Sequence, residues 1–171
     1  DIPKDPSAGV TLKNSDESQP AIQVSLPNAD RAKDATPVAN GTVAYEGENG
    51  SANAVQAPEE GGVRLLTVID SPSAPTTYDY KVTVPGGGHI ELSDDGGAIV
   101  KDSNGEIAAA VQAPWAKDAT DKAIPTYFTT DGQTLTQHVE HNQPGVVYPV
   151  TADPWFLPAL IAVAQTAAIG C

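Results

Sequence analysis

The sequence predicts an all-β fold, either an antiparallel β-sandwich or an open barrel, with a short hydrophobic helix at the C-terminal end. Short segments of alternating apolar and polar residues recur along the chain, as expected of half-buried strands. The 171 residues include 15 Gly and 15 Pro, which interrupt helices and favour turns. We therefore expect a polar arm (1–20), one β-rich domain (21–153) and a hydrophobic segment (154–171).

The predicted strands of the first half are short. Ile22, Val24 and Leu26 alternate with polar neighbours and predict a strand with one buried face. Residues 28–41 allow at most one helical turn, because Pro and Gly limit it. Further strands are expected in residues 42–47, 52–58 and 62–70.

The second half carries the clearer strand signals. Tyr78, Tyr80, Val82 and Val84 fall on one face of a strand, and the residues between them are polar. A strand over residues 88–93 follows. Two hairpins are expected, with turns at Asn104–Gly105 and Asp131–Gly132, because Asn-Gly and Asp-Gly suit tight hairpin turns. The last predicted strand covers residues 145–150.

Two short motifs occur twice in the chain. The motif VQAP occupies residues 55–58 and 111–114, and AKDAT occupies residues 32–36 and 116–120. AKDAT precedes VQAP in the first half of the chain and follows it in the second half. They are compatible with a weak duplication of residues 21–75 and 76–153, but they do not predict a repeat architecture.

An excess of acidic residues narrows the range of partners. The chain has 22 Asp and Glu against 9 Lys and Arg, a formal net charge of −13 and no basic run. Nucleic acid is therefore not an expected partner, because phosphate contacts require clustered Lys and Arg. The acidic composition favours solubility outside the cell, and cations, basic proteins and neutral glycans stay open as ligands.

The first residues favour an exported protein, and the cysteine content excludes a small domain held together by disulfides. The one cysteine is Cys171, so no disulfide can form within the chain, and its thiol can take a lipid or pair with a partner. The sequence lacks Met and begins with the polar run DIPKDPSAGV, which resembles a chain after removal of a signal peptide. We expect a secreted or cell-envelope protein.

Few residues suit catalysis or metal binding. The sequence has no Ser nucleophile elbow, no Cys within its body and no phosphate loop. His138 and Glu140 share a strand face, and His89 is the histidine that can complete a weak metal site with them. We predict no catalytic residue and no cofactor.

Carboxylates cluster at Glu59–Glu60, at Asp94–Asp95 and in residues 102–106. They allow weak calcium binding at loop ends, although residues 102–106 are too short for a calcium loop. Residues 85–89 allow either an anion nest or, more simply, a hairpin turn.

Two tryptophans follow prolines and therefore lie on extended or turning backbone. Trp115 and Trp155 can each close an end of the β core. Alternatively, an exposed Trp can act as a surface platform or sit at a membrane interface. Trp115 is the candidate platform.

The C-terminal segment has the composition of a helix. Pro158 suits its first turn, Gly170 suits its end, and apolar residues recur at helical spacing. A helix of about 13 residues reaches about 20 Å, which is shorter than the roughly 30 Å core of a bilayer. Three interpretations stay open: the helix docks on the domain, begins a longer segment, or enters a membrane or self-associates. The expected membrane or partner contacts are Trp155, Phe156, Leu157, Leu160, Ile161, Val163 and Ile169.

Residues 105–155 resemble a group of secreted actinobacterial β-module proteins. The pattern of that group runs from APWA-D through VPT and L-x-Q-x-V-x-H to YPV-ADPW. This chain matches it with IPT in place of VPT, at residues 124–126, and the match extends back to about Tyr78. The resemblance implies export through a signal peptide and a modular role, with a variable and often hydrophobic part after the final Trp. It carries no catalytic residues.

These observations predict an exported, non-enzymatic β module that presents, shields or anchors its hydrophobic C-terminal segment. The expected partner is a membrane or a protein, and homo-oligomerisation is compatible with this role. One alternative is a bacteriocin-like or pore-forming protein that acts through the segment. Others are a metal-dependent or hydrolytic enzyme using His89, His138 or Glu140, and an inhibitor or adhesin that binds through a loop.

Overall fold

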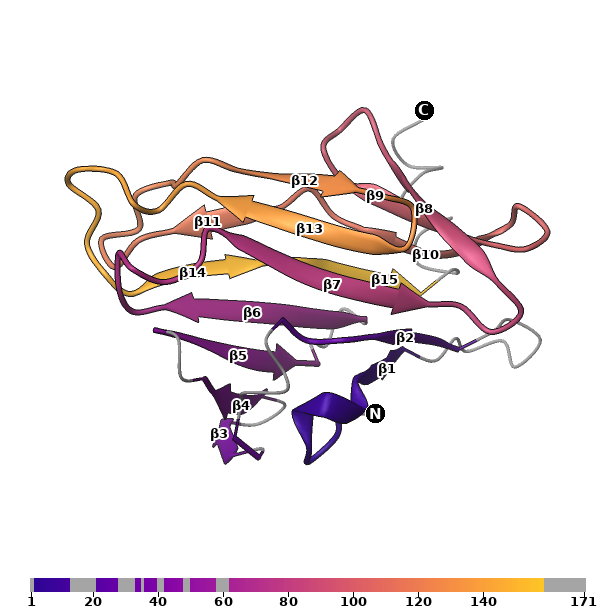
Figure 1. Cartoon of the computed structure of the whole chain (residues 1–171), viewed down its shortest axis with the longest axis horizontal. Helices are drawn as coiled ribbons and strands as arrows, with labels where there is room; N and C mark the ends of the chain where they lie inside the picture. Colours follow the sequence, from indigo (N-terminus) through magenta and orange to yellow (C-terminus); the bar gives the residue numbers. More distant parts are fainter. Residues whose placement is uncertain are drawn as a thin grey trace.

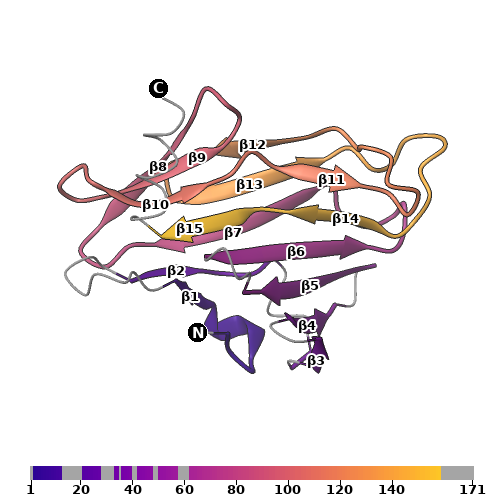
Figure 2. The ribbon, with the colours of Figure 1, turned by 180° about the vertical axis from the view of Figure 1, so that it is seen from behind.

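The computed structural model describes residues 2–12, 21–27, 33–34, 36–39, 42–47, 50–57 and 62–158. These residues form two antiparallel sheets, so the predicted all-β class is confirmed (Figures 1 and 2). Their one helical element is a short 3₁₀ turn, η1 (Pro6–Ala8). Residues 159–171, which hold most of the predicted C-terminal helix, lie outside the described residues.

The smaller sheet has five strands in the spatial order β1 (Val10–Leu12), β2 (Ile22–Val24), β7 (Thr77–Thr83), β13 (Thr134–Val139) and β12 (Thr126–Thr130). Along β7, Tyr78, Tyr80 and Val82 are buried and the residues between them are exposed, as the alternating pattern predicts. β1 comes from the segment expected to be a polar arm, because Val10 and Leu12 supply a buried face that pairs with β2.

The larger sheet has the spatial order β3 (Thr36–Ala39), β4 (Thr42–Glu46), β5 (Ser51–Gln56), β6 (Val63–Ile69), β15 (Trp155–Pro158), β10 (Ile107–Val111), β9 (Ala98–Asp102) and β8 (Gly88–Leu92). Beside this path, β14 (Val150–Asp153) pairs with β6 and with β11 (Trp115–Lys117). β14 and β15 therefore follow each other along the same neighbour, β6 (Figure 1).

The inward faces of the two sheets share one hydrophobic core. Tyr78 and Tyr80 of β7 are buried there together with Leu65 and Ile69 of β6. The hydroxyl groups of Tyr80 and Thr67 are hydrogen-bonded at 3.0 Å across the sheets, so each has a partner in the interior. Two layers with a common core give the molecule sandwich-like packing.

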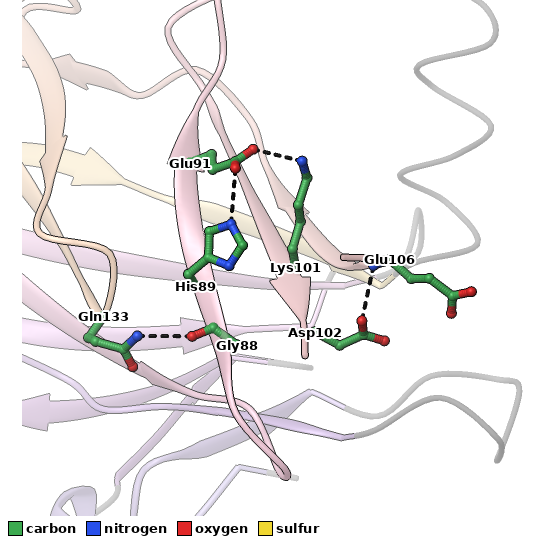
Figure 3. Close-up of polar contacts among 7 residues, drawn as sticks. All are labelled: Gly88, His89, Glu91, Lys101, Asp102, Glu106 and Gln133. Atoms are coloured by element: carbon green, nitrogen blue, oxygen red, sulfur yellow. Dashed lines mark hydrogen bonds and ion pairs between the residues drawn. The ribbon is translucent and has the colours of Figure 1, made fainter. Parts of the chain in front are cut away.

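Hydrogen bonds join the two sheets at one edge. The tip of the β12–β13 hairpin reaches β8, where the carbonyl oxygen of Gly132 accepts the backbone N–H of Ile90 at 2.8 Å. The side-chain amide of Gln133 donates to the carbonyl oxygen of Gly88 at 2.9 Å (Figure 3). Asp131 accepts the backbone N–H of Gln133, and the pairing of the two strands confirms the predicted hairpin.

The predicted last strand, residues 145–150, is mostly loop. The regular pairing of β14 begins at Val150. The backbone of Val147 is engaged by the turn after β11, where Asp118 accepts its N–H at 3.3 Å and its carbonyl oxygen accepts Ala119 N–H at 2.9 Å. The Tyr148 hydroxyl donates to the carbonyl oxygen of His141. These contacts replace a strand ladder.

β15 lies in the middle of the larger sheet. It pairs with β6 on one side and with β10 on the other. Phe156 and Leu157, expected to begin the hydrophobic segment, are 0% and 1% exposed. Gly62 borders this strand with a φ of +75°, and a Cβ there would collide with the carbonyl oxygen of Phe156. The sheet therefore extends past the predicted domain boundary to Pro158.

Candidate functional site

The predicted metal ligands make separate contacts. A ring nitrogen of His89 on β8 lies 3.0 Å from Glu91, and a ring nitrogen of His138 on β13 lies 2.8 Å from the hydroxyl of Thr129. Glu140 is exposed just beyond the end of β13. Within the described ranges, no group of three or more His, Cys, Asp and Glu side chains is arranged to hold a metal ion.

Exposed charged side chains link β8 and β9. Glu91 lies 3.0 Å from His89 and 2.8 Å from the ammonium group of Lys101 (Figure 3). Hydrogen bonds from Lys101 and then His89 hold the pKa of Glu91 below its usual value. Because these side chains are largely solvated, the network contributes little to stability, and it supports the pairing of two surface strands.

The turns at residues 102–106 and 85–89 are each closed by hydrogen bonds among their own residues and their immediate neighbours. In the β9–β10 turn, a carboxylate oxygen of Asp102 accepts the N–H of Asn104 at 2.9 Å. The same oxygen accepts the N–H of Glu106 at 3.0 Å (Figure 3). In the β7–β8 turn, the N–H of Gly87 donates to the carbonyl oxygen of Val84 at 3.0 Å. Both arrangements are typical of hairpin turns.

The two tryptophans flank one buried ion pair. Trp115 is the register partner of Asp153 in the β11–β14 pair, and Trp155 is the register partner of Arg64 in the β15–β6 pair. Arg64 Nε lies 3.1 Å from a carboxylate oxygen of Asp153, and its guanidinium carbon lies 4.6 Å from the ring centroid of Trp155. We call these four residues the Asp153 cluster. It brings together the APWA and ADPW motifs.

Burial dominates the electrostatics of the Asp153 cluster. The Asp153 side chain is 3% exposed. Loss of hydration raises its pKa to about 6, although Arg64 and hydrogen bonds from the backbone and indole N–H of Trp115 act in the opposite direction. Arg64 Nε and the nearby Asp153 oxygen have no hydrogen-bond partner among the described residues, so ion pairing alone compensates them.

Some of the predicted contact residues lie in β15, and the others lie outside the described residues. Trp155 is half-buried in β15, and Phe156 and Leu157 are buried there. Trp115, the candidate platform, is half-buried, and the ammonium group of Lys117 lies 5.6 Å from its ring centroid. A membrane or partner contact through this segment stays a prediction. Residues outside the described ranges are Leu160, Ile161, Val163, Ile169 and Cys171.

The outer face of β12, β13 and β7 carries two adjoining depressions. One, of about 440 Å³, is lined by Asp79, Thr129, Thr130, Asp131, Thr134 and Thr136. The other, of about 220 Å³, is lined by Thr76, Tyr127, His138, Val139, Glu140 and Asn142. His138 and Glu140 on this face are among the site residues predicted from the sequence, whereas its threonines are not. The signal was available on β13, where Thr134 and Thr136 alternate with buried residues.

Comparison of the chain with protein-family models, with curated proteins and with solved structures finds no match.

Proposed function

We propose that the protein is an exported, non-enzymatic β-sandwich module that holds a hydrophobic C-terminal segment, residues 154–171, and attaches it to a membrane or a protein partner. The observation that carries this proposal is the position of β15. The first residues of the apolar segment form a strand between β6 and β10, so the segment is continuous with the domain core.

Holding a segment requires resistance to its withdrawal. The ladders of β15 run to β6 and to β10, and both would have to break if the strand were pulled out. Withdrawal would also expose Phe156 and Leu157, which are buried, at a cost of about 1.5–3 kcal/mol for each side chain. The Asp153 cluster fixes the approach to the strand, because Arg64 contacts both Asp153 and Trp155.

The compartment follows from composition and resemblance. A net charge of −13 favours a domain that is soluble outside the cell. The resemblance of residues 105–155 to secreted actinobacterial β modules favours the same compartment, either secreted or in the cell envelope. In this proposal the apolar residues after Pro158 form a short helix that makes the contact.

The proposal is tested by comparing the full chain with a variant that ends at Pro158. Flotation with phosphatidylcholine vesicles and size-exclusion chromatography measure membrane binding and self-association. We expect the full chain to float or to oligomerise, and the shortened chain to stay monomeric in the aqueous fraction with an unchanged melting temperature. A full chain with Leu160→Asp and Ile161→Asp controls for chain length and should behave like the shortened chain.

Equal behaviour of all three proteins would overturn the proposal. A dye-release assay with the same vesicles separates attachment from pore formation. Binding without leakage supports attachment, whereas leakage caused by the full chain alone would replace our proposal with a pore-forming role.

A further inference from the structure

The geometry of the smaller sheet points to a second function: we propose that the outer face of β12, β13 and β7 binds a neutral oligosaccharide. This site lies on a different sheet from β15 and is independent of the proposed attachment role. The inference rests on a hydroxyl-rich depression, an exposed aromatic ring beside it, and the absence of Lys and Arg among the residues that line the two depressions.

Strand register places the polar side chains in rows. Thr129 of β12 faces Thr136 of β13, which in turn faces Asp79 of β7. In the next row, Tyr127 of β12 faces His138 of β13. Because successive outward residues on a strand are about 7 Å apart, the two rows form adjoining subsites along one ligand direction.

The first row supplies hydrogen-bonding groups that are already oriented. The Thr136 hydroxyl donates to a carboxylate oxygen of Asp79 at 2.7 Å, which fixes the Thr136 oxygen as an acceptor for a ligand hydroxyl. The other Asp79 oxygen can accept a second ligand hydroxyl. Asp131 and Thr134 line the same depression. Such a mixture of donors and acceptors matches a polyhydroxylated ligand better than an apolar one.

The second row supplies a stacking platform. The Tyr127 side chain is 48% exposed, and its ring stacks on His138 with a centroid distance of 4.5 Å and an interplanar angle of 4°. The hydrogen bond between His138 and Thr129 holds this backing ring in place. One face of Tyr127 is therefore supported, and the opposite face can receive the C–H groups of a sugar ring, whose partial positive charge suits the aromatic face.

Charge selects among ligands of similar size. The ionisable residues that line the two depressions are Asp79, Asp131, Glu140, Tyr127 and His138. At neutral pH the carboxylates give this face a negative potential, which disfavours phosphate, sulfate and uronate groups. A nucleobase could stack on Tyr127, but a nucleic acid would bring phosphates toward a chain of net charge −13. A neutral saccharide satisfies both the stacking and the hydrogen-bonding groups.

Affinity electrophoresis of the full chain tests the proposal. The gels contain hydroxyethyl cellulose, glucomannan, galactomannan, xylan, pullulan or glycol chitin, with dextran sulfate as the anionic comparison and EDTA throughout. We expect retardation by at least one neutral polysaccharide. Tyr127→Ala and Thr136→Val should each weaken that retardation at least tenfold, whereas Tyr127→Phe should keep it.

Val147→Ala is the matched control, because Val147 is 47% exposed and lies on the loop between β13 and β14, outside the lining of both depressions. It should migrate like the unmodified protein. Circular dichroism establishes that each variant is folded. Failure of every neutral polysaccharide to retard the chain, retardation by dextran sulfate alone, or equal retardation of Tyr127→Ala would each overturn the proposal.

Magnetic resonance of the histidine rings locates the site directly. Addition of a short oligosaccharide from the retarding polymer should shift the ring resonances of His138. The resonances of His89 on β8 and of the buried His141 should stay unchanged. A shift at His89 alone would place the ligand elsewhere and contradict the proposal. The outcome does not depend on residues 159–171, so the attachment role and the saccharide site can fail separately.

Discussion

Asp153 and Asp118 are both buried, at 2% and 5% exposure, yet their pKa values shift in opposite directions. Asp153 faces Arg64 without a hydrogen bond between the two closest atoms, and desolvation raises its pKa to about 6. Asp118 accepts hydrogen bonds from the hydroxyl and N–H of Thr120 and from the backbone of Lys122 and Val147. Led by the Thr120 hydroxyl, these donors lower its pKa to about 2.

The Asp153 shift predicts a specific pH dependence of stability. The folded-state pKa of about 6 exceeds the reference value of 3.8, so the folded protein favours the protonated carboxyl group. Its contribution to the free energy of unfolding is complete below about pH 4 and is lost as pH rises through about 6. The shift corresponds to at most about 3 kcal/mol. Asp153→Asn should abolish the decrease in the free energy of unfolding that Asp153 causes between pH 4 and pH 7, as measured by urea unfolding. Glu140→Gln, at an exposed carboxylate, should keep it; an unchanged profile in Asp153→Asn would contradict the assignment.

The pKa shift of Asp118 predicts the opposite pH dependence of stability. Its folded-state pKa lies below the reference value, so its stabilisation is present above about pH 4 and is lost as pH falls through about 2. Asp118→Ala should lower the melting temperature at pH 7 more than Asp118→Asn, which keeps one acceptor oxygen. The difference from the unmodified protein should shrink toward pH 2 in a thermal-melt series. If a variant's melting temperature differed from that of the unmodified protein equally at pH 7 and pH 2, the stabilising hydrogen bonds would not depend on the charge of Asp118.

At the scale of elements, β15 is the strand that joins two parts of the larger sheet. β3, β4, β5 and β6 lie on one side of it, and β10, β9 and β8 lie on the other. The carbonyl oxygen of Trp155 also accepts the N–H of Gln112, and that of Pro154 accepts the N–H of Leu65. A short strand thus completes backbone hydrogen bonding for neighbours that are distant from each other in sequence.

Packing of β15 can be tested at Phe156. Its side chain is 0% exposed within the common core, so Phe156→Ala should lower the free energy of unfolding by about 3–5 kcal/mol. Tyr127→Ala removes an aromatic ring of similar size from the surface and should change it by about 0.5 kcal/mol or less. Chemical denaturation measures both. Similar values for the two variants would show that β15 is not part of the cooperative core.

The strands that the sequence predicts well are those with clear alternation. β7 and the β12–β13 hairpin appear as expected, because their buried residues recur at every second position. β3 was missed, since Pro37 and Gly41 suggested a break, and an edge strand tolerates proline. β15 was assigned to the apolar segment because a strand buried on both faces has no alternation and looks like the start of a hydrophobic helix.

The candidate site was less predictable than the fold. Trp115 and Trp155 are both among the residues predicted from the sequence. Their convergence on Arg64 and Asp153 depends on the pairing of β11 with β14 and of β15 with β6. Local sequence does not encode such long-range register. In the same way, Asp79 meets Thr136 only because β7 and β13 are neighbours, although 57 positions separate them.

At the scale of the whole molecule, the net charge of −13 predicts a dependence on salt. Repulsion among carboxylates disfavours the compact state, and the screening length falls from about 30 Å at 0.01 M to about 3 Å at 1 M ionic strength. The melting temperature should therefore rise with sodium chloride concentration, as measured calorimetrically. Glu106→Gln combined with Glu140→Gln should reduce the rise. A melting temperature that falls with salt would mean that attractive ion pairs dominate.

The place of β15 also constrains how the nascent polypeptide acquires its structure. While Pro158 is still inside the ribosome, β6 and β10 lack the strand that connects them. At that stage the group β3–β6 and the group β8–β10 each end in a strand whose neighbour β15 has not yet emerged. The few residues of β15 then join the two groups into one continuous layer, so this part of the sheet can close only after residue 158 has left the ribosome.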